Sequence, residues 1–347
     1  MCAERPRLTV IVPCLNEEKR LPKFLDHLEQ QTIQPDEIIV ADGMSEDRTR
    51  ELLRLAAPRF IDLQVVDNIR RHVPAALNLA LRHSRGEYVA RMDTHADYDP
   101  NYLESVSTFL RENPEVAGVG GMMASAGVGD WGRAIASVLS KPWGLGGARH
   151  RVGGAGGPIQ HVFSGCYRRE ALEAIQGWDE RLKANEDFEA DVRMGANGRK
   201  IWLLPETRST WYVRESPRGL AKQMFRYGHY KALTLKLHPT SFRVRQAAPL
   251  LVVLLIAAAL TQRDRRLIAL TVAYAIATAI LGARSARQEM ASPLKGTVVP
   301  ALVHVTWGTG LLTGLFRYLL LEPRVSRMLK KNPTAGGERQ IAAQNDG

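Results

Sequence analysis

The first candidate for metal chemistry is an acidic residue that directly follows an apolar run. Asp93 comes after Tyr88–Met92, and His95 stands two positions further along. Because alternate residues of an extended chain face the same side, Asp93 and His95 could converge on one cation. Carboxylate and imidazole ligands suit Mg²⁺ or Mn²⁺, and such an ion could neutralise a departing diphosphate. The alternative is an ordinary loop in which Asp97 or Asp99 caps the next helix.

Polar residues also follow two earlier apolar runs. The run Thr9–Val12 leads into Pro13, Asn16 and Glu17, which could simply cap and start a helix. This turn lacks the GxGxxG pattern, which counts against a dinucleotide-dependent oxidoreductase. The second run ends at Asp42, whose carboxylate could accept hydrogen bonds from a base N–H or a ribose hydroxyl. The glycine after it would let a ligand approach the backbone.

The adjacent acids Glu186 and Asp187 open a predicted helix. Neighbouring carboxylates raise each other's pKa, which would suit a general base, whereas the dipole at a helix N-terminus favours the ionised form. The sequence leaves this balance open, and a purely structural role for the pair is the alternative.

A third polar group lies on a basic helix. Gln223 and Arg226 share one helical face, with Tyr227 beside them. An arginine next to an aromatic ring could grip a phosphate or stack on a sugar. An ordinary interfacial helix would have the same composition.

Alternating strands and helices must position these residues. Buried strands are predicted at Thr9–Val12, Glu37–Ala41, Ile61–Val66 and Tyr88–Met92, with helices between them, one of which runs from Ser45 toward Ala57. This alternation indicates an α/β fold with a parallel sheet and right-handed crossovers. Ligands of such sheets bind beyond the carboxyl ends of the strands, where the first candidate residues lie.

The segment that follows is less regular. Gly144–Gly157 is rich in glycine and is expected to be a mobile loop. Further strands are predicted at Phe163–Tyr167 and Ile201–Leu204, and helices at Arg169–Ile175 and Glu186–Ala196.

The net charge of +11 raises the question of a nucleic-acid partner. The basic residues gather between Arg214 and Arg245, however, where eight lysines and arginines accompany one acid, Glu215. Because this cluster directly precedes an apolar segment, we expect it to contact anionic membrane lipids, and we expect no nucleic-acid partner. A solvated surface is the alternative.

Three apolar segments follow, at Ala247–Thr261, Leu267–Ala283 and Val298–Leu315. The first would form roughly 22 Å of helix, against a hydrocarbon core of about 30 Å. The loop after it, QRDRR, is basic and should stay on the cytoplasmic side. The first two segments therefore fit poorly as a simple hairpin across the bilayer, and could cross with snorkelling flanks or lie partly re-entrant.

These features divide the chain into four parts. Residues 1–214 form an α/β domain, 215–245 a basic interfacial region, 246–321 about three membrane segments, and 322–347 a polar, disordered tail. Cys2, Cys14 and Cys166 leave an odd number for disulfides and indicate a reducing compartment. The first residues contain only a short apolar run, so no secretory signal is expected and the α/β domain should face the cytoplasm.

In their order along the chain, these fragments resemble family 2 glycosyltransferases of the GT-A fold, the Rossmann-like fold of nucleotide-diphospho-sugar transferases. The matching landmarks are VPCLNEE, ADGMSEDRT, ARMDTHAD, GCYRREAL, GWDE, NEDFEADVR and QMFRY. The glycine-rich segment and the apolar C-terminal part are most similar to bacterial exopolysaccharide enzymes of the succinoglycan glucosyltransferase type.

The resemblance implies which residues would bind the donor. Four positions match the nucleotide-binding turns and would surround uracil and ribose: Pro13, Asn16, Glu17 and Asp42. Asp93 matches the first acid of the DxD metal motif, and His95 replaces the second acid, so its contact with the metal is open. The implied cofactor is Mg²⁺ or Mn²⁺.

The resemblance also implies a catalytic base and an acceptor site. Asp187 matches the base of the ED motif, with Glu186 beside it, and Gly165 falls near the acceptor. Three further positions match the QxxRW motif, with tyrosine in place of tryptophan: Gln223, Arg226 and Tyr227.

The implied activity is an inverting transfer of a hexose, glucose foremost, from a UDP-sugar to a polyprenyl-diphosphate-linked saccharide. It would take place at the bacterial inner membrane, with the catalytic domain facing the cytoplasm. Two alternatives share the fold: a polyprenyl-phosphate sugar synthase and an inactive membrane scaffold.

Overall fold

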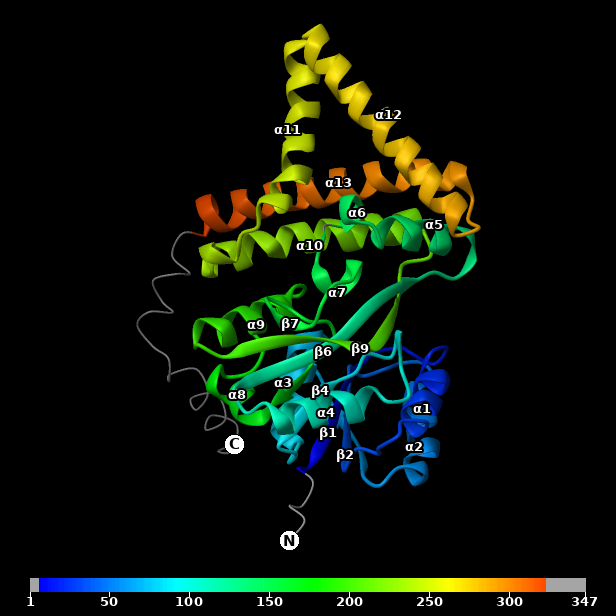
Figure 1. Cartoon of the computed structure of the whole chain (residues 1–347), viewed down its shortest axis with the longest axis vertical. Coiled ribbons are helices and arrows are strands. Elements are labelled where there is room, and N and C mark those ends of the chain that lie inside the picture. Colours follow the sequence, from blue (N-terminus) through cyan, green and yellow to red (C-terminus); the bar gives the residue numbers. More distant parts are fainter. Residues whose placement is uncertain (1–5, 146, 323–347) are drawn as a thin grey trace, which may run out of the picture.

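The computed structural model describes residues 6–145 and 147–322. One mixed sheet forms the centre of the α/β domain, with strand order β3-β2-β1-β4-β8-β6-β9-β5 and with β7 paired to β9 (Figure 1). Strands β1 (Leu8–Cys14), β2 (Glu37–Asp42), β3 (Leu63–Asp67) and β4 (Tyr88–Arg91) run parallel to one another, as the sequence predicts. The GT-A-type α/β fold class is thereby confirmed.

Helices cover both faces of this sheet because its strands bury side chains on both sides. On one face α1 (Leu21–Glu29), α2 (Thr49–Ala56) and α4 (Tyr102–Glu112) pack against the strands. On the other face lie α3 (Val73–His83), α8 (Arg169–Ala174) and α9 (Glu186–Ala196). The buried positions of α1 are its apolar residues at helical spacing, so this helix forms where its periodicity predicts.

The second half of the sheet departs from the parallel prediction. Strand β8 (Cys166–Arg168) runs antiparallel to β4 and to β6 (Val116–Ala126), and β5 (Ala96–Tyr98) and β7 (Gly157–Ile159) are antiparallel to β9 (Lys200–Tyr212).

Strand β6 has no counterpart among the predicted elements, because its glycines lower the strand propensity of the segment. A β-carbon at Gly118 would lie only 2.4 Å from the Tyr167 ring. Contact with neighbouring chain segments therefore requires these glycines, and local propensity does not reveal it.

Two further boundaries differ from the sequence prediction. Helix α2 begins at Thr49 and not at Ser45, because the backbone N–H of Ser45 is bound by the Asp42 carboxylate in a preceding turn. The glycine-rich segment contains the short helices α6 (Pro142–Leu145) and α7 (Arg149–Val152). Helix α5 (Gly129–Leu139) lies just before them.

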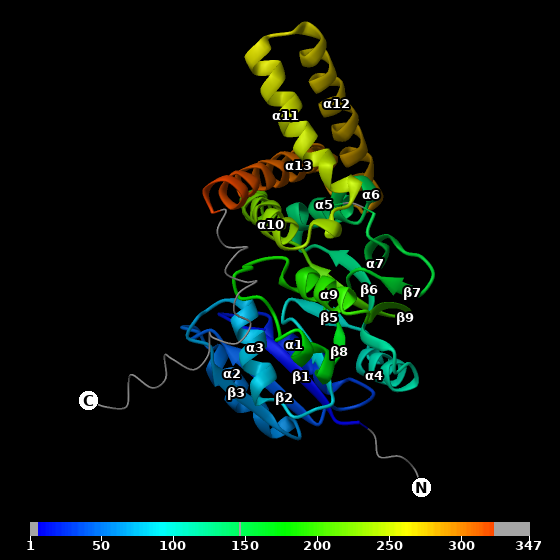
Figure 2. The ribbon, with the colours of Figure 1, turned by 90° about the vertical axis from the view of Figure 1, so that its left-hand side faces the viewer.

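Four helices form the end of the molecule opposite β1 and β2: α10 (Pro217–Leu237), α11 (Ala247–Gln262), α12 (Arg265–Gln288) and α13 (Pro293–Leu315). Helices α11 and α12 project away from the α/β domain, whereas α13 crosses beneath them and runs beside α10 (Figures 1 and 2). A π-helical turn, Phe316–Leu321, continues α13.

Three helical stretches are long and apolar enough to cross a membrane, and they differ in how far the protein covers them. Of the most apolar 18-residue stretch of each helix, 6% is buried inside the protein in Val244–Gln262 and in Arg265–Gln288, and 39% in Pro293–Leu321. The first two correspond to the projecting hairpin. The third combines an apolar composition with extensive packing on the rest of the chain.

Glycines let α13 approach its neighbours at backbone distance. A β-carbon at Gly310 would lie 2.1 Å from the Phe225 carbonyl oxygen of α10, and one at Gly308 would lie 2.2 Å from the Pro249 carbonyl oxygen of α11. Small residues allow this kind of close helix packing in membrane proteins. Helix α13 therefore joins the projecting hairpin to α10 and, through α10, to the α/β domain.

Candidate active site

A cavity of about 1170 Å³ opens beyond the carboxyl ends of β1 and β4 and reaches α10, α11 and α13. Nine of the residues singled out in the sequence line it: Pro13, Glu17, Asp93, His95, Glu186, Asp187, Gln223, Arg226 and Tyr227. They come from segments that are separated by up to about two hundred residues in the chain. The residues predicted to bind the sugar donor, to act as the base and to bind the acceptor thus line one continuous cavity.

Three other predicted residues are placed differently. Asn16 lines a smaller neighbouring cavity. Asp42 is fully buried, and its carboxylate accepts hydrogen bonds from the backbone N–H (3.0 Å) and the hydroxyl (2.5 Å) of Ser45. Gly165 packs against the Tyr167 ring, and its carbonyl accepts a hydrogen bond from the backbone N–H of Arg91. In this conformation Asp42 and Gly165 have structural contacts and do not line the larger cavity.

The turns after β1 and β2 bind each other through side chains. Asn16 has a positive φ of 55°, and its side-chain oxygen accepts from the backbone N–H of Glu46 at 2.8 Å. In return, the backbone N–H groups of Asn16 and Glu17 donate to the hydroxyls of Ser45 and Thr49. Residues expected to bind a nucleotide therefore also fix the shape of the turns that would surround it.

Arg91, at the end of β4, contacts three carboxylates of the cavity. Its Nε and Nη2 donate to the two carboxylate oxygens of Asp93 at 2.9 and 3.2 Å. Its Nη1 donates to Glu186 Oε1 at 3.2 Å and also to Asp187 Oδ1. The Arg91 side chain is 7% exposed, so this network is screened little by solvent. One guanidinium thus joins the candidate metal ligand to the candidate base.

Burial and charge act in opposite directions on these acids. Burial, followed by repulsion from Asp187, raises the pKa of Glu186 although Arg91 opposes the shift. Burial also raises the pKa of Asp187, again against the effect of Arg91. For Asp93, burial acts to raise the pKa, but the charge and hydrogen bond of Arg91, together with the charge of His95, hold the pKa below the ordinary value. The sequence leaves open whether the pKa values of Glu186 and Asp187 are raised or lowered. In the structure both pKa values are raised, which suits a general base.

The residues around Asp93 fit a divalent cation that takes most of its ligands from elsewhere. Strand β4 ends at Arg91, so Asp93 and His95 lie in a turn and not on a strand. Burial lowers the pKa of His95, which keeps its imidazole neutral and able to bind a metal. The Asp93 carboxylate has lone pairs beyond the two that Arg91 uses.

Within residues 6–145 and 147–322, no group of three or more His, Cys, Asp or Glu side chains could hold a metal. A Mg²⁺ or Mn²⁺ ion here would therefore depend on phosphate and water ligands, as Mg²⁺ sites commonly do.

Helix α10 is attached to the N-terminal end of α9. Gln223 Nε2 lies 3.3 Å from the Tyr227 hydroxyl, and Asn185 Nδ2 donates to the Tyr227 carbonyl at 2.9 Å. The first bond lies within α10, whereas the second joins the two helices; because Asn185 directly precedes Glu186, it brings Tyr227 next to the candidate base.

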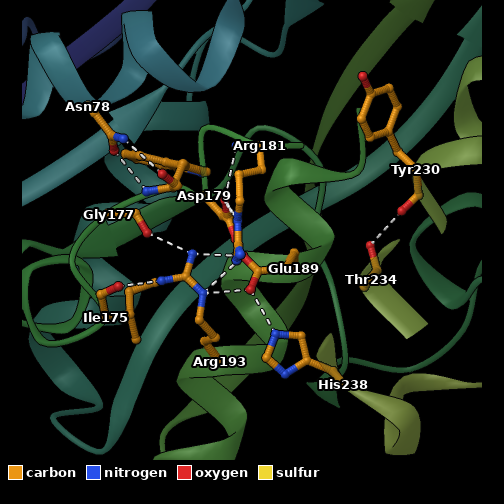
Figure 3. A network of polar contacts seen from close by, with 11 residues as sticks. Asn78, Ile175, Gly177, Asp179, Arg181, Glu189, Arg193, Tyr230, Thr234 and His238 are labelled. Atoms are coloured by element: carbon orange, nitrogen blue, oxygen red, sulfur yellow. Dashed lines mark hydrogen bonds and ion pairs between the residues drawn. The ribbon is translucent and has the colours of Figure 1, made fainter. Parts of the chain in front are cut away.

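A second polar network fixes α9 from its other side (Figure 3). Glu189 is 1% exposed, and it accepts hydrogen bonds from Arg193 Nε at 2.8 Å and from His238 Nε2 at 2.8 Å. Arg193 also donates to the carbonyl of Gly177 at 2.8 Å. This network connects α9 to the GWDE segment and to the residue that follows α10.

Arg91 is not among the predicted site residues, although it lies inside the ARMDTHAD landmark. The available signal was a charged residue in a strand that is otherwise apolar, since such a residue requires buried partners. His161 is also not among the predicted residues; it lines the cavity, and its Nδ1 lies 2.8 Å from the buried carboxylate of Asp191.

Comparison with known proteins agrees with this geometry. Residues 9–176 match the family model described as glycosyl transferase family 2. The chain is 31% identical over 250 residues to the succinoglycan biosynthesis protein ExoA of Rhizobium meliloti, covering 70% of this chain and 74% of that protein.

A second relative comes from Methanococcus voltae. It is the dolichyl N-acetyl-alpha-D-glucosaminyl phosphate 3-beta-D-2,3-diacetamido-2,3-dideoxy-beta-D-glucuronosyltransferase, 25% identical over 238 residues, which are 66% of this chain and 74% of that protein.

Among solved structures, the mannosyltransferase PcManGT from Pyrobaculum calidifontis, in complex with GDP-Man and Mn²⁺, has a TM-score of 0.60 and 21% identity. The match covers 92% of this chain and 88% of that chain. At this identity the likeness concerns the fold. The landmarks in the sequence, their convergence on one cavity and the long match to ExoA together show that this chain is a glycosyltransferase and belongs to glycosyl transferase family 2.

Proposed function

We propose that this glycosyltransferase moves a hexose, with glucose the first donor to test, from a UDP-sugar to a polyprenyl-diphosphate-linked saccharide in exopolysaccharide biosynthesis. The observation that carries the proposal is the shared cavity, which extends from Asp93 and Asp187 to Pro249 of α11 and Val303 of α13. A sugar attached to a lipid could reach the carboxylates while its lipid remains beside the apolar helices. The name of the Rhizobium relative refers to succinoglycan, which supports a role in exopolysaccharide biosynthesis, and that of the Methanococcus relative to a dolichyl-linked sugar phosphate, which supports a lipid-linked acceptor.

The proposed reaction is a single in-line displacement. The acceptor hydroxyl oxygen attacks the anomeric carbon from the face opposite the nucleotide, while the bond to the diphosphate oxygen breaks. Asp187 accepts the hydroxyl proton, for which its raised pKa is suited. An α-linked donor thereby yields a β-linked product.

Other side chains position and stabilise the reacting groups. A divalent cation held by Asp93 and His95 would neutralise charge on the departing diphosphate. Arg91 keeps the Asp187 carboxylate next to Asp93, and Arg226 adds positive charge to the cavity wall. Pro13 and Glu17 line the end of the cavity where the nucleotide would lie.

The projecting helices give the proposed membrane geometry. We propose that α11 and α12 insert into the inner membrane from its cytoplasmic side and that α13 lies against α10 near the head groups. The apolar, largely uncovered surface of the hairpin and the extensive packing of α13 support this arrangement.

Transfer of label from a panel of radioactive nucleotide sugars to extracted lipid tests the proposal. Full-length protein in membranes should label a polyprenyl-diphosphate saccharide in the presence of Mn²⁺ or Mg²⁺, and Asp187→Asn should abolish labelling while remaining folded and membrane-bound. Label found only on simple polyprenyl phosphate would favour a polyprenyl-phosphate sugar synthase. No transfer from any donor would favour a scaffold without activity.

A further inference from the structure

Two basic side chains line the cavity, and each has a buried nitrogen without a hydrogen-bond partner among the described residues. Lys231 of α10 is 4% exposed, and its Nζ has no hydrogen-bond partner among the described residues. Arg151 of α7 has a buried Nη1 that likewise lacks a partner within the described part of the chain. Both residues line the cavity.

Aromatic rings make the other contacts of these cations. Lys231 Nζ lies 3.8 Å from the centre of the Phe188 ring, and the Arg151 guanidinium lies 5.3 Å from the centre of the Trp211 ring. Cation–π contacts are favourable but leave N–H donors free. A buried ammonium without an acceptor costs free energy, so these donors indicate that an acceptor binds here.

Further positive charge surrounds Lys231. Burial, with the charges of Arg243 and Arg245, lowers the pKa of Lys231 to about 7. Arg243 Nε donates to Gln160 Oε1 at 2.9 Å, and Arg245 Nη1 donates to the Gly147 carbonyl at 3.2 Å. Neither contact is with an acid, so the mutual repulsion of these cations is not neutralised by their hydrogen-bond partners. The site therefore favours a ligand with more than one negative charge.

The position of the cluster distinguishes two possible diphosphates. The donor diphosphate must lie near Asp93, in the turn after β4. The cluster of Lys231, Arg243 and Arg245, in contrast, is formed by α10 and the segment before α11, and the same cavity is lined by Pro249, Val303 and Trp307 of the apolar helices. An anion bound here would have the apolar helix surface on one side. On the other side it would have Phe188, the residue that directly follows Asp187.

We propose that Lys231, Arg243 and Arg245 form a binding site for the diphosphate of the lipid-linked acceptor, with the first isoprene units beside α11 and α13. This inference rests on the proposed function, which it deepens by assigning the acceptor diphosphate to a site separate from the donor diphosphate. The saccharide then extends from the cluster past Phe188 toward Asp187.

Binding of farnesyl diphosphate tests the site without requiring catalysis. Tryptophan fluorescence of the full chain in detergent reports binding, because Trp143, Trp211 and Trp307 line the cavity. Lys231→Gln should weaken binding by about 10- to 100-fold, the loss expected for a charged hydrogen bond. Lys222→Gln, an exposed lysine on the same helix, is the matched control and should leave binding unchanged. Arg245→Gln gives a second variant at an exposed position.

Three probes identify which chemistry the site recognises. Farnesyl diphosphate should bind more tightly than farnesyl phosphate and than inorganic diphosphate, and Lys231→Gln should remove the preference for the second phosphate. Equal binding of inorganic diphosphate would overturn the lipid assignment, and equal binding of all three probes to Lys231→Gln and to the unmodified protein would overturn the site.

Steady-state kinetics then separate this inference from the proposed function. Lys231→Gln should raise the KM for the polyprenyl-diphosphate saccharide and leave the KM for the nucleotide sugar unchanged. A parallel rise in the donor KM would assign the cluster to the donor diphosphate and refute the inference. Absence of any lipid-linked product from the unmodified protein would instead count against the proposed function, while farnesyl diphosphate binding still decides the site.

Discussion

Replacement of Arg91 by methionine removes a guanidinium that contacts Asp93, Glu186 and Asp187 together. Methionine retains much of the side-chain volume, so the main change is the loss of the guanidinium. Three carboxylates then remain close together in a site where the Asp93 and Asp187 side chains are only 4% and 15% exposed. Because Arg91 lowers the pKa of each of these acids, all three pKa values should rise in the variant.

The expected loss of stability is large. Removing one partner of a buried ion pair costs about 3–5 kcal/mol. For a domain of this size, that corresponds to a fall of about 6–20 °C in the thermal midpoint. The loss should depend on pH with a definite sign. A carboxylate whose pKa is raised in the folded state is destabilising above that pKa, and the penalty disappears as pH falls through it. The deficit of Arg91→Met should therefore be largest at neutral and alkaline pH and shrink on acidification.

Thermal denaturation and transfer rates measured across pH test this reasoning. The midpoint difference between the variant and the unmodified protein should narrow as the pH falls and the three carboxylates take up protons. The acidic limb of kcat/KM should move to higher pH, since the base stays protonated to higher pH.

Two matched variants isolate the charge network from other effects. Arg91→Lys retains the charge without the planar fork and should be intermediate in stability and in pH profile. Arg82→Met, at an exposed arginine of α3, should match the unmodified protein. A stability deficit of Arg91→Met that is constant with pH, together with an unchanged acidic limb, would refute the assignment of Arg91 as the group that controls these carboxylates.

Three further predictions concern the metal, helix α9 and helix α13. His95→Ala should raise the Mn²⁺ concentration that gives half-maximal transfer by about tenfold, and an unchanged metal titration would exclude His95 as a ligand. Glu189→Gln should lower the free energy of unfolding by about 3 kcal/mol because its buried charge accepts from two basic side chains, whereas the exposed Glu173→Gln should have little effect in the same denaturation assay. Gly310→Val should cost about 3 kcal/mol in thermal unfolding because its β-carbon would overlap the α10 backbone, while Gly195→Ala, which has open space, should not destabilise the protein.

The first half of the fold follows from local sequence patterns. The apolar runs of β1, β2 and β4 are buried on both faces, and α1 buries its apolar positions at helical spacing. Such periodicity is a property of neighbouring residues, so the sequence determines it. The same patterns placed Asp93 at a strand end and Asp187 at a helix start, where the structure has them.

Tertiary contacts decide the second half of the fold. Strand β6 is held by pairing with β8 and β9, and the close approach of Tyr167 leaves room only for glycine at position 118. Strand β9 is far longer than its apolar core because it pairs with β5, β6 and β7. Strand propensity carries no information about a partner that lies elsewhere in the chain.

The sequence by itself determined the family, the α/β fold and nine of the residues that line the cavity. Only the tertiary structure decided that the Asp42 carboxylate accepts a hydrogen bond from Ser45 and that Arg91 forms ion pairs with both Asp93 and Asp187. It also decided that Lys231 Nζ has no hydrogen-bond partner among the described residues. The physical reason is that burial and electrostatic pairing depend on which distant segments meet. The type and spacing of residues indicate what chemistry a side chain can perform. The fold determines which partners the side chain contacts and how far it is exposed to solvent.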